Sequence, residues 1–125
     1  MLPIMAFALL TAAQTSADDF ADRVTRARLA ETAADGPAYQ KAFWDKTGNP
    51  MTDAGKACLK SSPQADRSPF TLVAAISADG HPKRVEVRPP TPVAQCMANQ
   101  FRTWTFPVPP RHSGDYPIEI DVTLP

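Results

Sequence analysis

Apolar residues at every second position predict three β-strands in the second half of the chain. Residues 70–76 and 83–88 both show this alternation, and residues 116–124 show it most regularly. A period of two is the pattern of a strand with one buried face. Asp79-Gly80, between the first two segments, is a dipeptide typical of tight hairpin turns. The pattern therefore predicts a hairpin and, later in the chain, a separate strand.

The segment between the hairpin and the last strand has the period of a helix. Thr91-Pro92 is a favourable start, with Thr as the N-cap and Pro at the first helical position. Beyond it, apolar residues recur every three or four positions as far as Trp104, and Cys96 lies among them. Pro107 prevents the helix from continuing. We expect Trp104 and Phe106 to fill the end of the interface between this helix and the sheet.

The first half of the chain reads as three short helices, at 18–34, 38–46 and 53–61. The stretch 47–50 contains Gly and Pro and is expected to end the second helix. Thr52 is the expected N-cap of the third helix. The apolar stripe of the first helix is narrow, so we expect that helix to be loosely docked. The predicted fold class is α+β, with short N-terminal helices followed by a β-β-α-β unit.

Residues 1–17 have the character of a secretory signal peptide. An apolar run ends in small residues around Ala17, ahead of the acidic pair Asp18-Asp19. The run is far shorter than the ~20 residues of a membrane-spanning helix. The alternative is a buried N-terminal helix. We expect export to the periplasm by a cleavable signal, with no retained membrane anchor.

Charge and composition exclude some classes of partner. The chain has 13 basic and 13 acidic residues, which gives no electrostatic footprint for nucleic acid. Its 14 prolines are scattered among the junctions between predicted elements. The charged side of 83–88 carries Lys83, Arg84 and Arg88 beside Glu86, and we interpret it as a solvated strand face.

The two cysteines, Cys58 and Cys96, lie far apart in the sequence, which excludes a CxxC redox motif. An exported protein meets an oxidising compartment, where an even number of thiols favours a disulfide. The alternative is a pair of buried free thiols. A disulfide closing this loop would stabilise the fold by about 4 kcal/mol in the chain-entropy model.

Catalytic and metal-binding chemistry has little support in the sequence. The chain has no GxSxG, HExxH, P-loop or GxGxxG motif. His81 and His112 lie in polar turns, and a metal site with Asp79 and Asp115 would need two turns at ligand spacing. We expect no enzyme activity, no cofactor and no metal.

Three strings carry a resemblance to a known family: FTLVAAISADGHPKRVEV, CMANQFRTWTFP and YPIEIDVTL. Together they resemble the TonB C-terminal domain superfamily, and most closely its periplasmic AgmX/PglI-like branch. Asp79-Gly80 corresponds to the turn of that family. The residues corresponding to its helix motif are Cys96, Phe101, Trp104, Phe106 and Pro107. The similarity covers residues 70–124 and does not extend to 18–67.

The resemblance implies a three-stranded antiparallel sheet with a helix packed on one face. It also implies a periplasmic protein-binding module. We divide the chain into the signal peptide (1–17), a helical N-terminal region (18–67) and a TonB-like region (68–125) that forms one compact domain with 36–67. The cleavable signal and the lack of a long Pro-rich spacer indicate binding without energy transduction.

Strand addition is the binding mode that the resemblance implies. In that architecture the final strand can lie at the sheet edge, where its backbone groups are open to a partner strand. The partner would be a periplasmic or outer-membrane protein. The alternative is a small disulfide-bonded periplasmic inhibitor or immunity protein that blocks an enzyme with the loop 107–116. The candidate edge residues are Ile118, Glu119, Ile120, Asp121, Val122 and Thr123.

Overall fold

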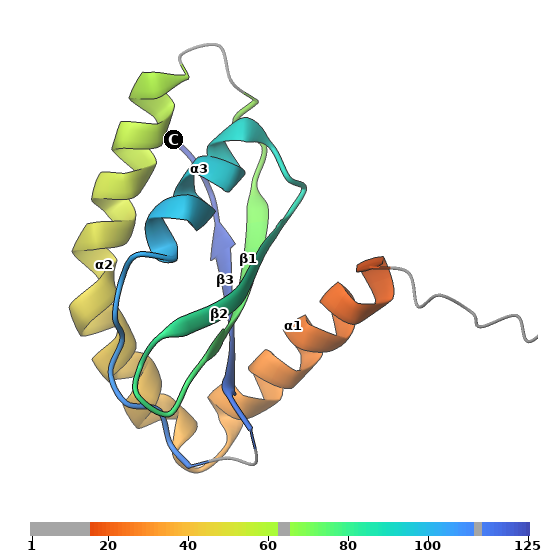
Figure 1. Ribbon diagram of the computed structural model, residues 1–125, viewed down its shortest axis with the longest axis vertical. Helices are drawn as coiled ribbons and strands as arrows, with labels where there is room; N and C mark the ends of the chain where they lie inside the picture. Colours follow the sequence, from red (N-terminus) through yellow and green to blue (C-terminus); the bar gives the residue numbers. More distant parts are fainter. Residues whose placement is uncertain (1–15, 63–65, 112–113) are drawn as a thin grey trace, which may run out of the picture.

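The computed structural model describes residues 16–62, 66–111 and 114–125. Three helices and a three-stranded antiparallel sheet make up the fold, in the order ααββαβ along the chain (Figure 1). This confirms the predicted α+β class. The elements are α1 (Ser16–Thr32), α2 (Gly36–Ser61), β1 (Phe70–Ile76), β2 (Pro82–Arg88), α3 (Pro92–Phe101) and β3 (Tyr116–Val122).

The sheet has the strand order β2-β1-β3, so β2 and β3 are its two edges. Helices α2 and α3 lie on one side of the sheet and α1 lies on the other (Figure 1). The main core is the layer between the sheet and the α2–α3 pair. Its largest fully buried side chains include Leu72 and Ile76 of β1, Phe101 of α3 and Tyr116 of β3. Thr91 caps α3 as expected, since its side-chain oxygen accepts a hydrogen bond from the Ala94 N–H.

The predicted disulfide is confirmed. Cys58 of α2 is bonded to Cys96 of α3, with a Cα–Cα distance of 5.8 Å. Cys58 is completely buried. The bond therefore fixes α2 against α3 inside the core, and the alternative of two free thiols is wrong.

The predicted break in the second helical region is wrong. Helix α2 continues through Pro50, and Thr52 is an interior residue whose hydroxyl donates to the Gly48 carbonyl at 3.1 Å. Packing explains the difference, because one buried stripe runs the whole length of the helix and outweighs the local cost of Gly and Pro. The stripe consists of Tyr39, Phe43, Thr47, Met51, Ala54 and Cys58.

Helix α1 is firmly docked, contrary to the expectation from its narrow apolar stripe. Phe20, Ala27 and Ala30 are buried, and the Arg88 guanidinium lies 5.6 Å from the centre of the Phe20 ring. Arg23 also points inward and is only 5% exposed. The charged side of β2, which we expected to be solvated, therefore lies partly under α1.

The β1–β2 hairpin forms at the predicted turn and is held by the segment after α3. Gly80 has a φ of +87°, and a Cβ at this position would collide with the Phe106 carbonyl oxygen. The Phe106 N–H donates to the Gly80 carbonyl at 2.9 Å. Glycine is therefore needed here both for the turn and for the close approach of a second backbone segment.

The predicted signal peptide lies mostly outside the described residues, since 1–15 are not among them. Ala17, the expected cleavage position, lies in the first turn of α1. Among the residues that the structure describes, none of the helices combines the length and the apolar character needed to cross a membrane.

Candidate functional site

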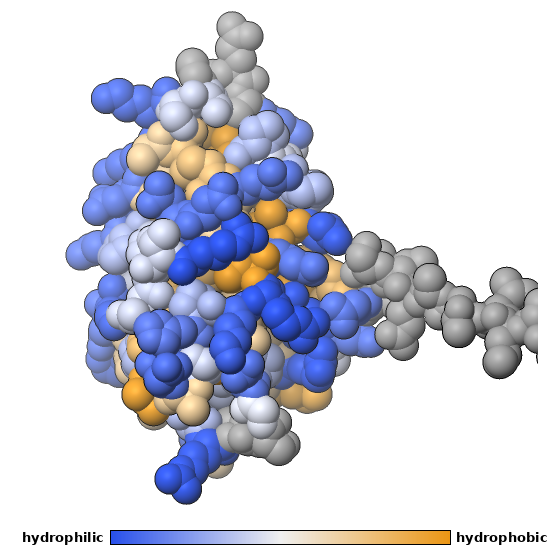
Figure 2. Space-filling view, in the orientation of Figure 1, coloured by the Kyte–Doolittle hydropathy of each residue, from blue (hydrophilic) through white to orange (hydrophobic). Residues whose placement is uncertain are grey.

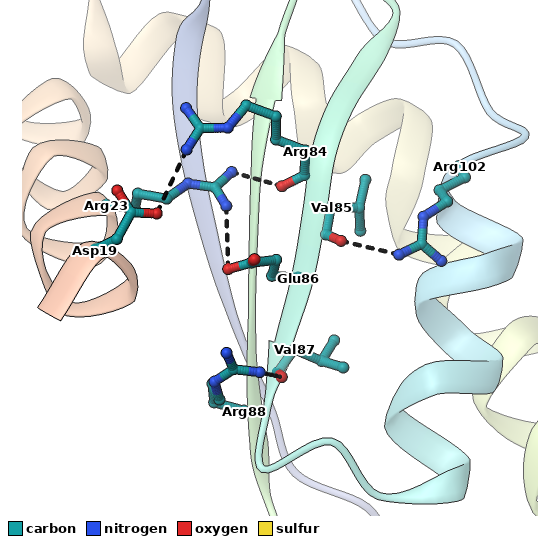
Figure 3. A network of polar contacts seen from close by, with 8 residues as sticks. All are labelled: Asp19, Arg23, Arg84, Val85, Glu86, Val87, Arg88 and Arg102. Atoms are coloured by element: carbon teal, nitrogen blue, oxygen red, sulfur yellow. Dashed lines mark hydrogen bonds and ion pairs between the residues drawn. The ribbon is translucent and has the colours of Figure 1, made fainter. Parts of the chain in front are cut away.

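On the edge strand β2, several backbone carbonyls already accept hydrogen bonds from side chains. Strand β2 lies in front of β1 and β3 in Figure 1, and Figure 2 shows that this side of the molecule is mostly hydrophilic, with hydrophobic residues in a few small patches. Three arginine side chains donate to its carbonyl oxygens (Figure 3). The pairs are Arg23 with Arg84 at 2.6 Å, Arg102 with Val85 at 2.9 Å and Arg88 with Val87 at 3.3 Å. A partner strand would have to displace these side chains, so β2 is a protected edge.

The other edge strand, β3, is open along part of its length. It pairs with β1 from Tyr116 to Val122, and no strand among the described residues pairs with its opposite side. Near its start, the Tyr116 hydroxyl donates to the Ala30 carbonyl at the end of α1, at 3.5 Å. Ile118 and Ile120 are buried in the core, whereas Asp121 and Thr123 are exposed. Residues 120–125 border a groove, so the C-terminal half of this edge is the candidate binding surface.

An apolar groove of about 310 Å³ lies beside that half of β3, with α2 as its opposite wall. Trp44 is 41% exposed, which makes it one of three large apolar side chains exposed among the described residues. The sequence prediction assigned no groove residue on α2, and it interpreted the helical spacing of Tyr39, Phe43 and Trp44 as a core pattern. The apolar side chains that line the groove are Trp44, Met51, Leu59, Met97, Ile120, Val122, Leu124 and Pro125.

The residues of the helix motif have different environments. Phe101 is fully buried and Phe106 is 4% exposed. The Phe106 ring stacks on Phe43 with centroids 5.2 Å apart, and it contacts Phe101 at 4.7 Å. Trp104 is only half-buried and packs on Phe101 from the margin of the core. Phe106, and not Trp104, therefore fills the end of the helix–sheet interface.

Pro107 has a structural role next to this aromatic cluster. Its carbonyl accepts a hydrogen bond from the Tyr39 hydroxyl at 3.0 Å, which links the segment after α3 to the start of α2. The motif residues therefore support the core, and none of Phe101, Phe106 or Pro107 is among the residues that line the groove.

Glu119 carries a negative charge in an unfavourable place. Its side chain is 9% exposed and lies 3.8 Å from the Arg28 guanidinium of α1. Burial raises the pKa of this carboxyl above its ordinary value, and the nearby charges of Asp121 and Glu31 raise it further. Arg28 acts in the opposite direction but does not compensate. Folding therefore works against the ionisation of Glu119.

Glu119→Gln should raise the melting temperature at neutral pH. In the wild type, ionised Glu119 opposes folding at any pH above the ordinary glutamate pKa of about 4.3. Below that pH the carboxyl is protonated in both the folded and the unfolded state, so the penalty disappears. The difference in melting temperature between variant and wild type should therefore shrink as the pH falls from 7 to 4, which a series of thermal melts would measure. A stabilisation that persists unchanged at pH 4 would contradict this origin.

The hairpin turn places a serine, an aspartate and a histidine together without forming a catalytic arrangement. The Ser77 hydroxyl donates to the Asp79 carboxylate, and its oxygen accepts from the backbone N–H of His81 at 3.0 Å. The His81 imidazole lies 3.6 Å from the same carboxylate. Since the hydroxyl bonds the acid and not the imidazole, the group stabilises the turn, and the His81 imidazole is not placed to accept the serine proton. His112 lies outside the described residues.

Within the described ranges 16–62, 66–111 and 114–125, no three His, Cys, Asp or Glu side chains gather closely enough to hold a metal ion.

Comparison of the chain with models of protein families, with curated proteins and with solved structures gave no match. The similarity to TonB C-terminal domains therefore stays a prediction from the motif residues. The open edge of β3 and its groove are the features from which a function can be argued.

Proposed function

We propose that the protein is a non-catalytic binding module that accepts an extended segment of a partner protein along the open edge of β3. The observation that carries this proposal is the difference between the two sheet edges. Arginine side chains occupy carbonyls of β2, whereas β3 borders an apolar groove. A partner strand at β3 would gain backbone hydrogen bonds from the edge and apolar contacts from the groove.

The shape of the groove suits an added strand. Successive side chains of a strand point to opposite faces, so every second residue of a docked segment would enter the groove. The stretch 120–125 corresponds to about six residues, or roughly 20 Å of extended chain. Met51 and Met97 both line the groove, and methionine adapts readily to side chains of different shape. The partner segment is therefore a short stretch with alternating apolar residues.

The disulfide supports an exported protein, because such bonds persist in oxidising compartments. We accordingly assign the module to the periplasm and its partner to the periplasmic or outer-membrane proteins. Capture of the partner from periplasmic extract provides the ligand for the experiments below.

Trp44→Ala should weaken partner binding about tenfold or more, because exposed tryptophans in interface pockets are frequent hot spots. The matched control is Leu29→Ala, since Leu29 is 66% exposed on α1, across the sheet from the groove. That variant should bind like the wild type. Titration of the captured partner into each protein measures the affinities. If the two variants bind the partner with equal affinity, the groove is not part of the binding site.

Amide hydrogen exchange with the partner bound provides an independent readout. Strand addition should create new protection within residues 118–123. The exposed Val108 marks the loop before β3 as the other candidate surface. Protection confined to the described part of the 107–115 loop would contradict strand addition and favour the inhibitor or immunity protein.

A further inference from the structure

A recess of about 390 Å³ lies on the opposite side of the sheet from the groove, between α1 and the start of β3. Its lining includes three arginines, Arg23 and Arg26 of α1 and Arg84 of β2. Ala75, Pro117 and the acidic Asp115 form part of the lining as well. Three positive charges and one negative charge therefore line the recess.

The backbone holds two of these guanidinium groups side by side. The pairing register of β1 and β2 shifts between Val73 and Ala75, and Arg84 has a φ of +52° at this bulge. The Arg84 side chain then folds back across the sheet toward Asp19, at 3.4 Å, with the Arg23 guanidinium close by (Figure 3). Arg23 is almost fully buried and is fixed by its bonds to β2. The arrangement is organised before any ligand arrives.

Positive charge exceeds negative charge around the recess. Each acidic residue there already engages one basic residue, and Arg26 has no ion-pair partner among the residues described. Burial lowers the pKa of Arg23, and the neighbouring positive charge of Arg84 lowers it further. Glu86 and Asp19 act in the opposite direction and offset part of this effect. The engaged pairs are Asp19 with Arg84, Glu86 with Arg23, and Asp115 with Lys83.

We propose that this recess binds a multiply charged oxyanion, either a phosphate group or a cluster of carboxylates. Arginine presents five N–H donors in a planar fork, and each of the three guanidinium groups has donors left beyond the bonds described above. Oxyanion oxygens accept two parallel hydrogen bonds from such a fork. The volume of the recess lies within the range of small-ligand sites, so it accommodates the anion with part of the molecule that carries it.

Isothermal titration of the full chain with inorganic phosphate and with citrate tests the proposal, with sodium chloride at matched ionic strength as the reference. Arg26→Gln removes the unpaired guanidinium and should weaken binding about tenfold or more. Arg84→Gln should do the same, after circular dichroism shows that the variant is folded. The control is Arg67→Gln, which removes the same charge from an exposed arginine near Pro125, beyond the opposite end of β3.

The proposal is supported if Arg67→Gln still binds phosphate or citrate and Arg26→Gln does not. The anion that binds more tightly shows whether the natural ligand carries a phosphate group or a cluster of carboxylates. Heats no larger than those of chloride for both anions would overturn it. Equal affinities of Arg26→Gln and Arg67→Gln would overturn it as well. The groove variant Trp44→Ala and its control Leu29→Ala do not enter this experiment, so it is independent of the proposed strand addition.

Discussion

Replacing Cys58 and Cys96 together with alanine should lower the free energy of unfolding by about 4 kcal/mol. The two cysteines are 38 residues apart, and the cross-link restricts the unfolded chain by closing that loop. A loss of this size is a large share of the 5–15 kcal/mol typical of a folded domain. Urea unfolding of the oxidised wild type and the double variant measures it. Identical unfolding midpoints would show that the bond does not stabilise the fold.

The cysteine variant should also affect the groove. Leu59 follows Cys58 and Met97 follows Cys96, and both Leu59 and Met97 line the groove beside β3. The disulfide thus fixes the distance between two elements that shape the binding surface. Partner affinity should fall in the double variant at urea concentrations where the fold remains intact by circular dichroism.

Phe106→Ala should lower the free energy of unfolding by about 3–5 kcal/mol, the usual range for a buried phenylalanine. Phe106 fills the space between Phe43 of α2 and Phe101 of α3, and the cavity left by alanine would separate two elements of the core. Thermal or urea unfolding measures the loss.

Trp104→Ala is the matched comparison for this prediction. Trp104 belongs to the same motif but is only half-buried, so its removal should cost clearly less than that of Phe106. If Trp104→Ala proved as destabilising as Phe106→Ala, the sequence-based expectation for Trp104 would hold and the packing described here would be wrong.

The elements with a clear period could be predicted from the sequence. The alternation in 70–76 and 116–124, the Asp79-Gly80 turn and the Thr91 cap are local signals, and each corresponds to the observed element. The ends of two elements differ from the prediction. The helical pattern continues to Trp104 but α3 ends at Phe101, and the strand pattern continues to residue 124 but β3 ends at Val122. Helix α2 was missed as a single element because Pro50 is a local signal for a break, whereas the buried stripe that maintains the helix depends on tertiary contacts.

The candidate site was only partly predictable for the same reason. The regular pattern of 116–124 predicted the strand itself, and the resemblance to TonB-like domains implied that this strand can lie at the sheet edge, which agrees with the sheet order. The protection of the opposite edge depends on Arg23 and Arg102, which lie far from β2 in the sequence and reach it only after folding. The docking of α1 depends on the same kind of contact, because Phe20 of α1 packs against Arg88 of β2.

The arginine side chains that bond to the carbonyls of β2 limit how many strands can be added to the sheet. Open-ended growth of a sheet through many molecules needs two complementary edges on each copy, one to accept and one to offer. In this protein Arg102 and Arg23 occupy carbonyls of one edge, which leaves a single edge for association. A complex formed at β3 is therefore complete after one addition, whether the added strand comes from a partner or from a second copy. Under the proposed strand addition, the open edge would therefore not lead to fibres.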